Sequence, residues 1–196
     1  MTPIARPLVV VLTGPESTGK TTIAAWLARR FDVPWSAEGA RAYVDARLAE
    51  DRAVQLGFDT VTPIAELHVA LEDAADADAA RRGSPMVVRD TDLISTVAYS
   101  RALYGTAPEW VVGAARARRG DHYLLCDVDA PWVADHVRGE AGDRFAMRDV
   151  FMETLAEMGA DFTVLAGAWE TRLREAESIV AGWLRVRSND ELHQQG

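Results

Sequence analysis

The sequence predicts an α/β fold in which a parallel sheet is covered by helices. Short runs rich in β-branched residues recur between longer stretches with helical periodicity, and this alternation is typical of parallel sheets. The runs that we expect to be strands are Leu8 to Thr13, Val33 to Ala37, Pro85 to Arg89, His122 to Asp127 and Phe162 to Leu165. We find no internal repeat and no low-complexity linker, so we expect a single domain over residues 1–187.

Two segments carry the apolar stripe of helices that pack on a sheet. Between residues 20 and 31, Ile23, Leu27 and Phe31 recur four residues apart, which places them on one helix face. A second stripe runs through Trp169, Leu173, Ala176, Val180 and Trp183. Residues 188–196 are polar and lack such a stripe, and this predicts a flexible tail.

A third helical pattern, from Pro63 to Arg82, contains an acidic run. Its members are Glu72, Asp73, Asp76 and Asp78. Such a run could be taken for a set of metal ligands, but acidic residues on a helix more often form a solvated face. We therefore expect these side chains to face water.

Composition narrows the functional classes. The chain has 196 residues, 48% of them hydrophobic, which is enough for one sizeable core. Its formal net charge of −9 argues against non-specific binding to nucleic acid or to an anionic membrane. The single cysteine, Cys126, allows no disulfide within the chain, and the first apolar run, Leu8 to Leu12, is too short to span a membrane. We expect no signal peptide and a cytoplasmic location.

The strongest local signal lies directly after the first predicted strand. Gly14 to Thr21 fits the pattern G-x-x-x-x-G-K-[ST], and an amphipathic helix follows it. In such a loop the backbone N–H groups surround phosphates, the lysine (Lys20) reaches the outer phosphates, and the Thr21 hydroxyl holds Mg²⁺. The nucleotide should contact Gly14, Glu16, Ser17, Thr18, Gly19, Lys20, Thr21 and Thr22. The motif predicts binding of ATP or GTP, because a mere glycine turn rarely has this context.

Several linked motifs resemble one family. The phosphate loop together with Asp90 to Thr96 is similar to the ribosylnicotinamide kinase domain of NadR-type proteins. Glu38 to Tyr43 resembles the family pattern Glu-Tyr-Gly/Ala-Arg-x-Tyr/Phe, and Pro131 to Arg138 resembles Trp-Val-x-Asp-Gly-x-Arg. The chain departs from the family at His68, where glutamine is frequent, and at His136, where glycine is usual.

The resemblance implies a P-loop NTPase three-layer sandwich with a five-stranded parallel sheet, helices on both faces and a helical lid at about residues 131–150. It also implies transfer of the ATP γ-phosphate to the 5′-hydroxyl of nicotinamide riboside. The expected cofactors are ATP and Mg²⁺, and the expected partner is a small nucleoside. The departures leave the nucleoside less firmly predicted than the kinase chemistry.

Phosphoryl transfer requires positioning and charge neutralisation, and three carboxylates offer these functions. Asp90 follows the third predicted strand, where a carboxylate beside the phosphate loop would bind Mg²⁺. Asp92 either contacts the acceptor or caps a helix. Glu38 ends the second strand, and ligands of parallel sheets collect at the carboxyl ends of strands. We expect Glu38 to accept the proton of the 5′-hydroxyl, with Arg41 holding the acceptor or a phosphate.

The remaining candidates are arginines and aromatic side chains. Arg138 and Arg144 flank a glycine-containing stretch that would act as a lid over the γ-phosphate. Arg172 follows the last strand, either near adenine or with a role only at a helix start. Trp35 and Tyr43 could enclose a cationic pyridinium ring, or they could be ordinary core aromatics.

Two other functions share parts of this pattern. Another nucleoside or nucleotide kinase would have the same phosphate loop and lid. A regulatory ATPase would also have the loop, but the arginines and the acceptor-like carboxylates within this chain weigh against it.

Overall fold

The computed structural model describes residues 6–50, 55–129 and 143–193. Its elements, in chain order, are β1 (Leu8–Thr13), α1 (Lys20–Phe31), β2 (Trp35–Ser36), α2 (Gly39–Ala49), the short 3₁₀ helix η1 (Phe58–Thr60), α3 (Val61–Arg82), β3 (Met86–Asp90), α4 (Leu93–Tyr104), α5 (Glu109–Ala117), β4 (His122–Cys126), α6 (Arg144–Glu157), β5 (Phe162–Leu165) and α7 (Trp169–His193). Each of the five predicted strands is present.

The strands form one parallel sheet in the order β2-β3-β1-β4-β5. Leu12 of β1 lies level with Asp90 of β3 on one side and with Leu124 of β4 on the other. The carboxyl ends of the three central strands therefore meet at one edge of the sheet, directly below the loop that follows β1. The predicted fold class, an α/β sandwich on a five-stranded parallel sheet, is confirmed.

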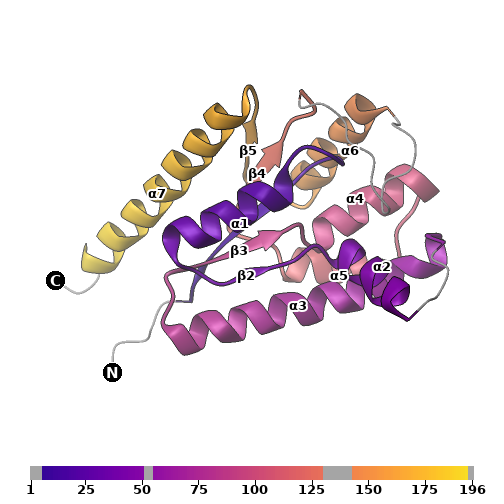
Figure 1. Cartoon of the computed structure of the whole chain (residues 1–196), viewed down its shortest axis with the longest axis horizontal. Helices are drawn as coiled ribbons and strands as arrows, with labels where there is room; N and C mark the ends of the chain where they lie inside the picture. Colours follow the sequence, from indigo (N-terminus) through magenta and orange to yellow (C-terminus); the bar gives the residue numbers. More distant parts are fainter. Residues whose placement is uncertain (1–5, 51–54, 130–142, 194–196) are drawn as a thin grey trace.

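Helices cover both faces of the sheet (Figure 1), and alternating side chains of β1 contact a different layer on each face. Val10 and Leu12 pack with α1 and α7, whereas Val11 packs with α4, α5 and α6. Val10, Val11 and Leu12 are all fully buried, as expected for a central strand covered on both faces. The result is a three-layer arrangement that holds the loops at the sheet edge on a rigid base.

Several boundaries differ from the sequence prediction. β2 contains only Trp35 and Ser36, because the chain turns into α2 at Gly39. α7 continues to His193, so the helix extends into the segment predicted as a flexible tail. Residues 144–150 of the predicted lid form the start of α6, which Phe151 and Leu155 anchor in the core. The rest of that lid, residues 130–142, lies outside the described residues.

The acidic run on α3 is not a uniformly solvated face, so that prediction was wrong in part. Glu72 is fully buried and pairs with Arg89 of β3 at 3.2 Å and with Arg118 at 3.0 Å. Asp76 pairs with the same Arg89 at 2.9 Å. The described residues contain no cluster of three or more ligating side chains that could hold a metal. They also contain no helix that is both long enough and apolar enough to span a membrane.

Candidate functional site: the phosphate loop and the adjoining cavity

The loop between β1 and α1 has the backbone that the phosphate-loop pattern requires. Gly14 has φ +125°, and a Cβ there would lie 2.7 Å from the carbonyl oxygen of Cys126. Gly19, the residue before α1, has φ +87°, and a Cβ there would lie 2.6 Å from the ring of Trp169. Only glycine fits at both positions. The loop thus turns tightly between β4 and α7 and ends at the N-terminus of α1.

Within this loop the side chains of Thr18 and Lys20 converge on one backbone oxygen. Thr18 Oγ1 donates to the carbonyl of Pro15 at 2.8 Å, and Lys20 Nζ donates to the same carbonyl at 2.7 Å. Lys20 is only 6% exposed, although its ammonium group lines the cavity beside the loop. Thr21 and Thr22 follow in the first turn of α1, and Thr22 is exposed.

Arg172 supports the loop from behind instead of facing a nucleotide. Its guanidinium group is 1% exposed and donates to the carbonyls of Thr18 at 3.1 Å, Asp127 at 3.1 Å and Gly167 at 3.0 Å. It also pairs with Asp129. Of the two roles considered for Arg172, the geometry favours the one without an adenine contact, because the donors of this buried group are directed at backbone carbonyls.

The carboxyl end of β3 places Asp90 below the loop. Asp90 is 1% exposed, and neither carboxylate oxygen has a hydrogen-bond partner in the described part of the chain. Burial, reinforced by repulsion from Glu38, raises the pKa of Asp90 to about 6, while Thr21, Lys20 and Arg41 act in the opposite direction. A buried carboxylate without a donor, close to a hydroxyl, is the kind of group that a hard cation would satisfy.

Glu38 and Arg41 stand at the start of α2. Glu38 occupies the N-cap position, and its carboxylate lies 3.8 Å from Nε of Arg41. Both residues line the same cavity as Lys20. The structure therefore brings together Lys20, Glu38, Arg41 and Asp90, as the sequence analysis expected.

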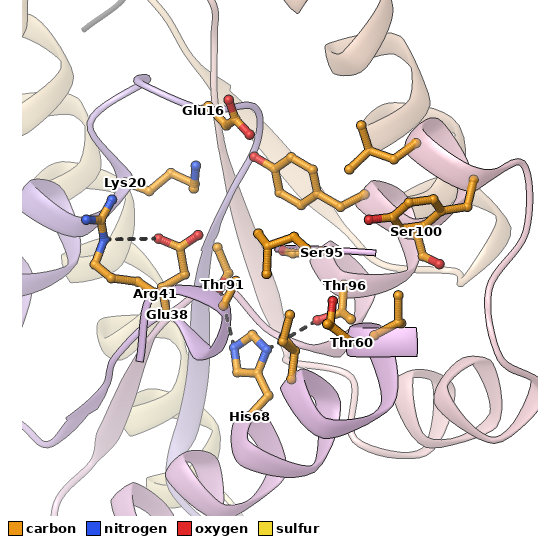
Figure 2. A pocket seen from close by; sticks show the side chains of 17 residues that line it. Glu16, Lys20, Glu38, Arg41, Thr60, His68, Thr91, Ser95, Thr96 and Ser100 are labelled. Carbon is orange, nitrogen blue, oxygen red and sulfur yellow. Dashed lines mark hydrogen bonds and ion pairs between the residues drawn. The ribbon is translucent and has the colours of Figure 1, made fainter. Parts of the chain in front are cut away.

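The cavity runs from these charged groups to a neutral end (Figure 2). Lys20, Glu38 and Arg41 lie together on one side, and Thr60, Thr96 and Ser100 lie on the other. We call the side with Thr60, Thr96 and Ser100 the neutral end. The cavity is also lined by Leu56, Val61, Ile64, His68, Leu103 and Tyr104. Glu16 of the phosphate loop and Tyr99 of α4 also line the cavity, and the Tyr99 hydroxyl lies 3.5 Å from the carbonyl oxygen of Gly14.

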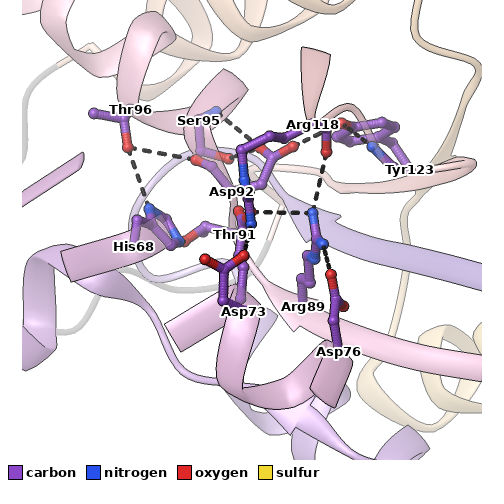
Figure 3. A network of polar contacts seen from close by, with 12 residues as sticks. His68, Asp73, Asp76, Arg89, Thr91, Asp92, Ser95, Thr96, Arg118 and Tyr123 are labelled. Carbon is purple, nitrogen blue, oxygen red and sulfur yellow. Dashed lines mark hydrogen bonds and ion pairs between the residues drawn. The ribbon is translucent and has the colours of Figure 1, made fainter. Parts of the chain in front are cut away.

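Asp92 belongs to a buried polar network instead of this cavity (Figure 3). It is the N-cap of α4: Oδ1 accepts from the backbone N–H of Ser95 at 3.1 Å, and Oδ2 accepts from the hydroxyl of Tyr123 at 2.6 Å. The side chain is 1% exposed. Of the two functions considered for Asp92, the geometry favours helix capping over contact with the acceptor.

The aromatic residues at the cavity differ from those expected. Trp35 is 39% exposed on the edge strand, and the ring of Tyr43 lies under the guanidinium of Arg47, so neither lines the cavity. Tyr99 and Tyr104 do line it. Both lie on α4, which starts within the Asp90–Thr96 motif. The sequence could have identified them if the helix that begins in this motif had been extended to Tyr104.

The two predicted lid arginines are placed differently. Arg138 lies outside the described residues, and Arg144 begins α6. On the same helix, Arg148 reaches Asp127 at 3.4 Å, next to the end of β4. Sequence reasoning did not identify Arg148, which joins α6 to the edge of the sheet that carries the phosphate loop.

The fold and this site together define a P-loop nucleotide-binding domain. Comparisons with known proteins agree. A family model described as an AAA domain matches residues 9–172, and the chain belongs to that family. The chain is also similar to NadR proteins: it is 30% identical over 155 residues to the trifunctional NAD biosynthesis/regulator protein NadR of Salmonella typhimurium.

Two solved structures extend the likeness in three dimensions. The crystal structure of NadR in complex with NAD and AMP-PNP has a TM-score of 0.69 and 26% identity, and covers 92% of this chain. NadR in complex with NR has a TM-score of 0.66 and 23% identity, and covers 90%. The chain spans 37% of the Salmonella protein and 50% and 49% of the two crystallised chains, so the likeness concerns a part of each.

Proposed function

We infer that this chain transfers the γ-phosphate of ATP to the 5′-hydroxyl of nicotinamide riboside and so forms nicotinamide mononucleotide. The observation that carries this inference is the cavity that extends from the phosphate loop along the hydroxyls and tyrosines of α4. The relation to NadR, whose crystal structures contain NR in one case and AMP-PNP in another, supports both substrates.

The position of Lys20 orients the acceptor. Because the ammonium group serves phosphate, the hydroxyl that receives the phosphoryl group must lie at the charged end of the cavity. The base then extends toward Thr60, Thr96 and Ser100. A nucleoside enters this arrangement with its 5′ carbon first.

Glu38 is our candidate for the group that accepts the hydroxyl proton. It lines the charged end, and its carboxylate lies beside Arg41. A general base must lie within hydrogen-bond reach of the proton it removes. Glu38 is close enough to Asp90, at the end of β3 below the phosphate loop, to raise the pKa of that carboxyl. Arg41 would neutralise charge on the transferred group or hold the acceptor.

Asp90 and Thr21 fit a divalent cation. The two buried oxygens of Asp90 have no donor in the described part of the chain, and the Thr21 hydroxyl is close to them. Mg²⁺ bound there would neutralise charge on the nucleotide phosphates. Arg138 and Arg144 remain our candidates for cations that approach the γ-phosphate from the segment after β4.

The two tyrosines that line the cavity suit a flat cationic ring. Nicotinamide riboside carries a pyridinium, and aromatic faces attract such cations. Tyr104 packs edge to face with Phe58 at 5.8 Å between ring centroids, and Tyr99 does so with Phe151 at 5.1 Å. These contacts fix the planes of the two tyrosines before a substrate arrives, which lowers the entropy cost of binding.

The test is the formation of nicotinamide mononucleotide by the purified protein with ATP and Mg²⁺, detected by chromatography. Lys20→Ala is the matched control, because the variant should fold and yet lose nearly all turnover, so a contaminating kinase would be exposed. We expect rapid ADP release with nicotinamide riboside and slow release without an acceptor. If kcat/KM is far higher with thymidine or another ordinary nucleoside, then that nucleoside, and not nicotinamide riboside, is the acceptor.

A further inference from the structure

One buried histidine of α3 touches each element that carries a carboxylate of the site. His68 is 2% exposed and lines the cavity. One ring nitrogen, Nδ1, lies 3.3 Å from Oγ1 of Thr96, and the other, Nε2, lies 3.3 Å from Oγ1 of Thr91 (Figure 3). Thr91 directly follows Asp90, so the imidazole is bonded to the turn that places this carboxylate.

The same ring also fixes the start of α2. A Cβ added at Gly39 would lie 2.8 Å from Cγ and 3.0 Å from Nδ1 of His68, closer than a real Cβ comes to another heavy atom. Gly39 directly follows Glu38. The His68 side chain therefore packs directly against the backbone next to Glu38.

The turn that His68 contacts is strained. Thr91 has φ +66°, in the left-handed region that β-branched residues avoid. Such a conformation persists only where its surroundings hold it. Two contacts do so here: the backbone N–H of Thr91 donates to the carbonyl of Leu12 at 2.9 Å, and its hydroxyl meets His68.

We propose that His68 is a positioning residue that sets the separation of Glu38 and Asp90 by holding the first turn of α2 and the β3–α4 turn on one rigid ring. This proposal rests on the function inferred above, since it assigns Glu38 and Asp90 to phosphoryl transfer. It gives a reason for the departure from the family pattern at this position. Glutamine offers a donor and an acceptor from one amide, whereas the imidazole offers them from two sides of a fixed plane.

Neutrality of the ring suits this arrangement. Burial, with a smaller contribution from Arg89, lowers the pKa of His68 to about 4. A neutral imidazole keeps one donor and one acceptor, so the hydroxyls of Thr91 and Thr96 meet complementary partners. It also adds no charge next to Glu38 and Asp90.

The test compares four variants: His68→Ala, His68→Gln, Gly39→Ala and the double variant Gly39→Ala/His68→Ala. Removing the ring should lower kcat by roughly 10- to 100-fold, because misplacement by about 1 Å costs up to that much, with the KM for ATP within about 2-fold. His68→Gln should recover most of kcat. Gly39→Ala should also lower kcat, and the double variant should lose less than the product of the two single losses, because the added methyl group then occupies the space that the ring has left.

Ala79→Gly is the matched control for a purely structural effect. Ala79 is fully buried in the last turn of the same helix, far along the chain from the cavity, so the variant loosens α3 without touching the site. We expect it to lower resistance to urea and to leave kcat unchanged. Hydrogen exchange should show faster opening of residues 39–42 and 91–96 in His68→Ala and normal exchange there in Ala79→Gly.

Three results would overturn the proposal. The first is a folded His68→Ala variant with near-normal kcat. The second is a His68→Ala variant in which only the KM for the riboside changes. The third is an equal loss of kcat in His68→Ala and Ala79→Gly. Failure of the proposed function is seen separately, as absence of turnover by the unaltered protein with nicotinamide riboside. The kinetic comparison is then made with whichever nucleoside the protein accepts, and hydrogen exchange decides the positioning role if it accepts none.

Discussion

Glu38 and Asp92 are two carboxylates of one sheet edge whose surroundings give them different chemistry. Glu38 lines the cavity with its carboxylate 3.8 Å from Arg41. Asp92 is enclosed, with Ser95 and Tyr123 donating to its oxygens. Burial raises the pKa of Asp92, and these donors act against that rise. A group whose lone pairs are occupied by the protein is poorly placed to receive a proton from a substrate.

We therefore predict opposite phenotypes for two conservative substitutions. Glu38→Gln keeps the shape but loses the basic carboxylate, so kcat should fall by roughly 100-fold or more while the KM for ATP hardly changes. Asp92→Asn should lower the free energy of unfolding by about 1–3 kcal/mol, because a buried hydrogen-bond pair is disturbed, and should affect kcat less. Steady-state kinetics and urea unfolding on both variants provide the measurement.

The opposite pattern of kcat and stability would reverse these roles. A near-normal kcat for Glu38→Gln at saturating riboside would remove Glu38 as the base. Loss of kcat in Asp92→Asn without loss of stability would return the acceptor role to Asp92.

At the scale of elements, α3 is fastened to the sheet by charge as well as by apolar contact. Glu72 lies between Arg89 of β3 and Arg118 after α5, and its side chain is fully buried. Asp73, its neighbour in sequence, also pairs with Arg118, but its side chain is 61% exposed. Arg118 thus pairs with one buried carboxylate, Glu72, and one exposed carboxylate, Asp73, which are neighbours on α3.

This contrast predicts very different stabilities for two alanine variants. Glu72→Ala removes the fully buried carboxylate between Arg89 and Arg118 and leaves the buried Arg89 only the partly exposed Asp76, which should lower the free energy of unfolding by about 3–5 kcal/mol. Asp73→Ala removes an exposed pair and should cost about 1 kcal/mol or less. Urea denaturation of the two variants tests this, and similar losses in both would mean that the buried pair contributes no more than the surface pair.

At the scale of the whole molecule, His68 links stability to pH. An unfolded histidine has a pKa near 6.5, and burial lowers the pKa of His68 to about 4. Between these values protons bind the unfolded chain in preference to the folded one, so stability that is present above pH 6.5 is lost as the pH falls toward 4. By pH 5 this loss amounts to about 2 kcal/mol.

We predict that His68→Gln is less sensitive to acid than the unaltered protein. The difference in unfolding free energy between pH 7 and pH 5 should be smaller in the variant by about 2 kcal/mol, because glutamine does not titrate. Burial raises the pKa of Glu72 to about 7, which has the opposite sign, but this contribution is common to both proteins and cancels. Parallel pH dependences of the two proteins would show that His68 takes up protons equally well when folded.

Local patterns alone determined much of this molecule. Leu8–Thr13 and Phe162–Leu165 are strands over the residues predicted for them, because strands of a covered parallel sheet are continuous apolar runs. The phosphate loop could also be predicted from the sequence, because a short-range turn fixes the positions of its glycines and of Lys20. The meeting of Glu38 and Asp90 followed from parallel topology, which brings strand ends to one edge.

Tertiary structure decided what depends on burial and on distant partners. Glu72 looked like a surface charge, and only its packing against Arg89 and Arg118 made it internal. Two roles were open for Arg172, near adenine or at a helix start, and only the folded structure shows that it donates to the carbonyl of Thr18, 154 residues earlier in the chain. His68 contacts Gly39 and Thr91 only because the packing of α3 brings these distant parts of the chain together. A periodic pattern identifies the helix a side chain belongs to, but what that side chain meets depends on how the helices and the sheet pack.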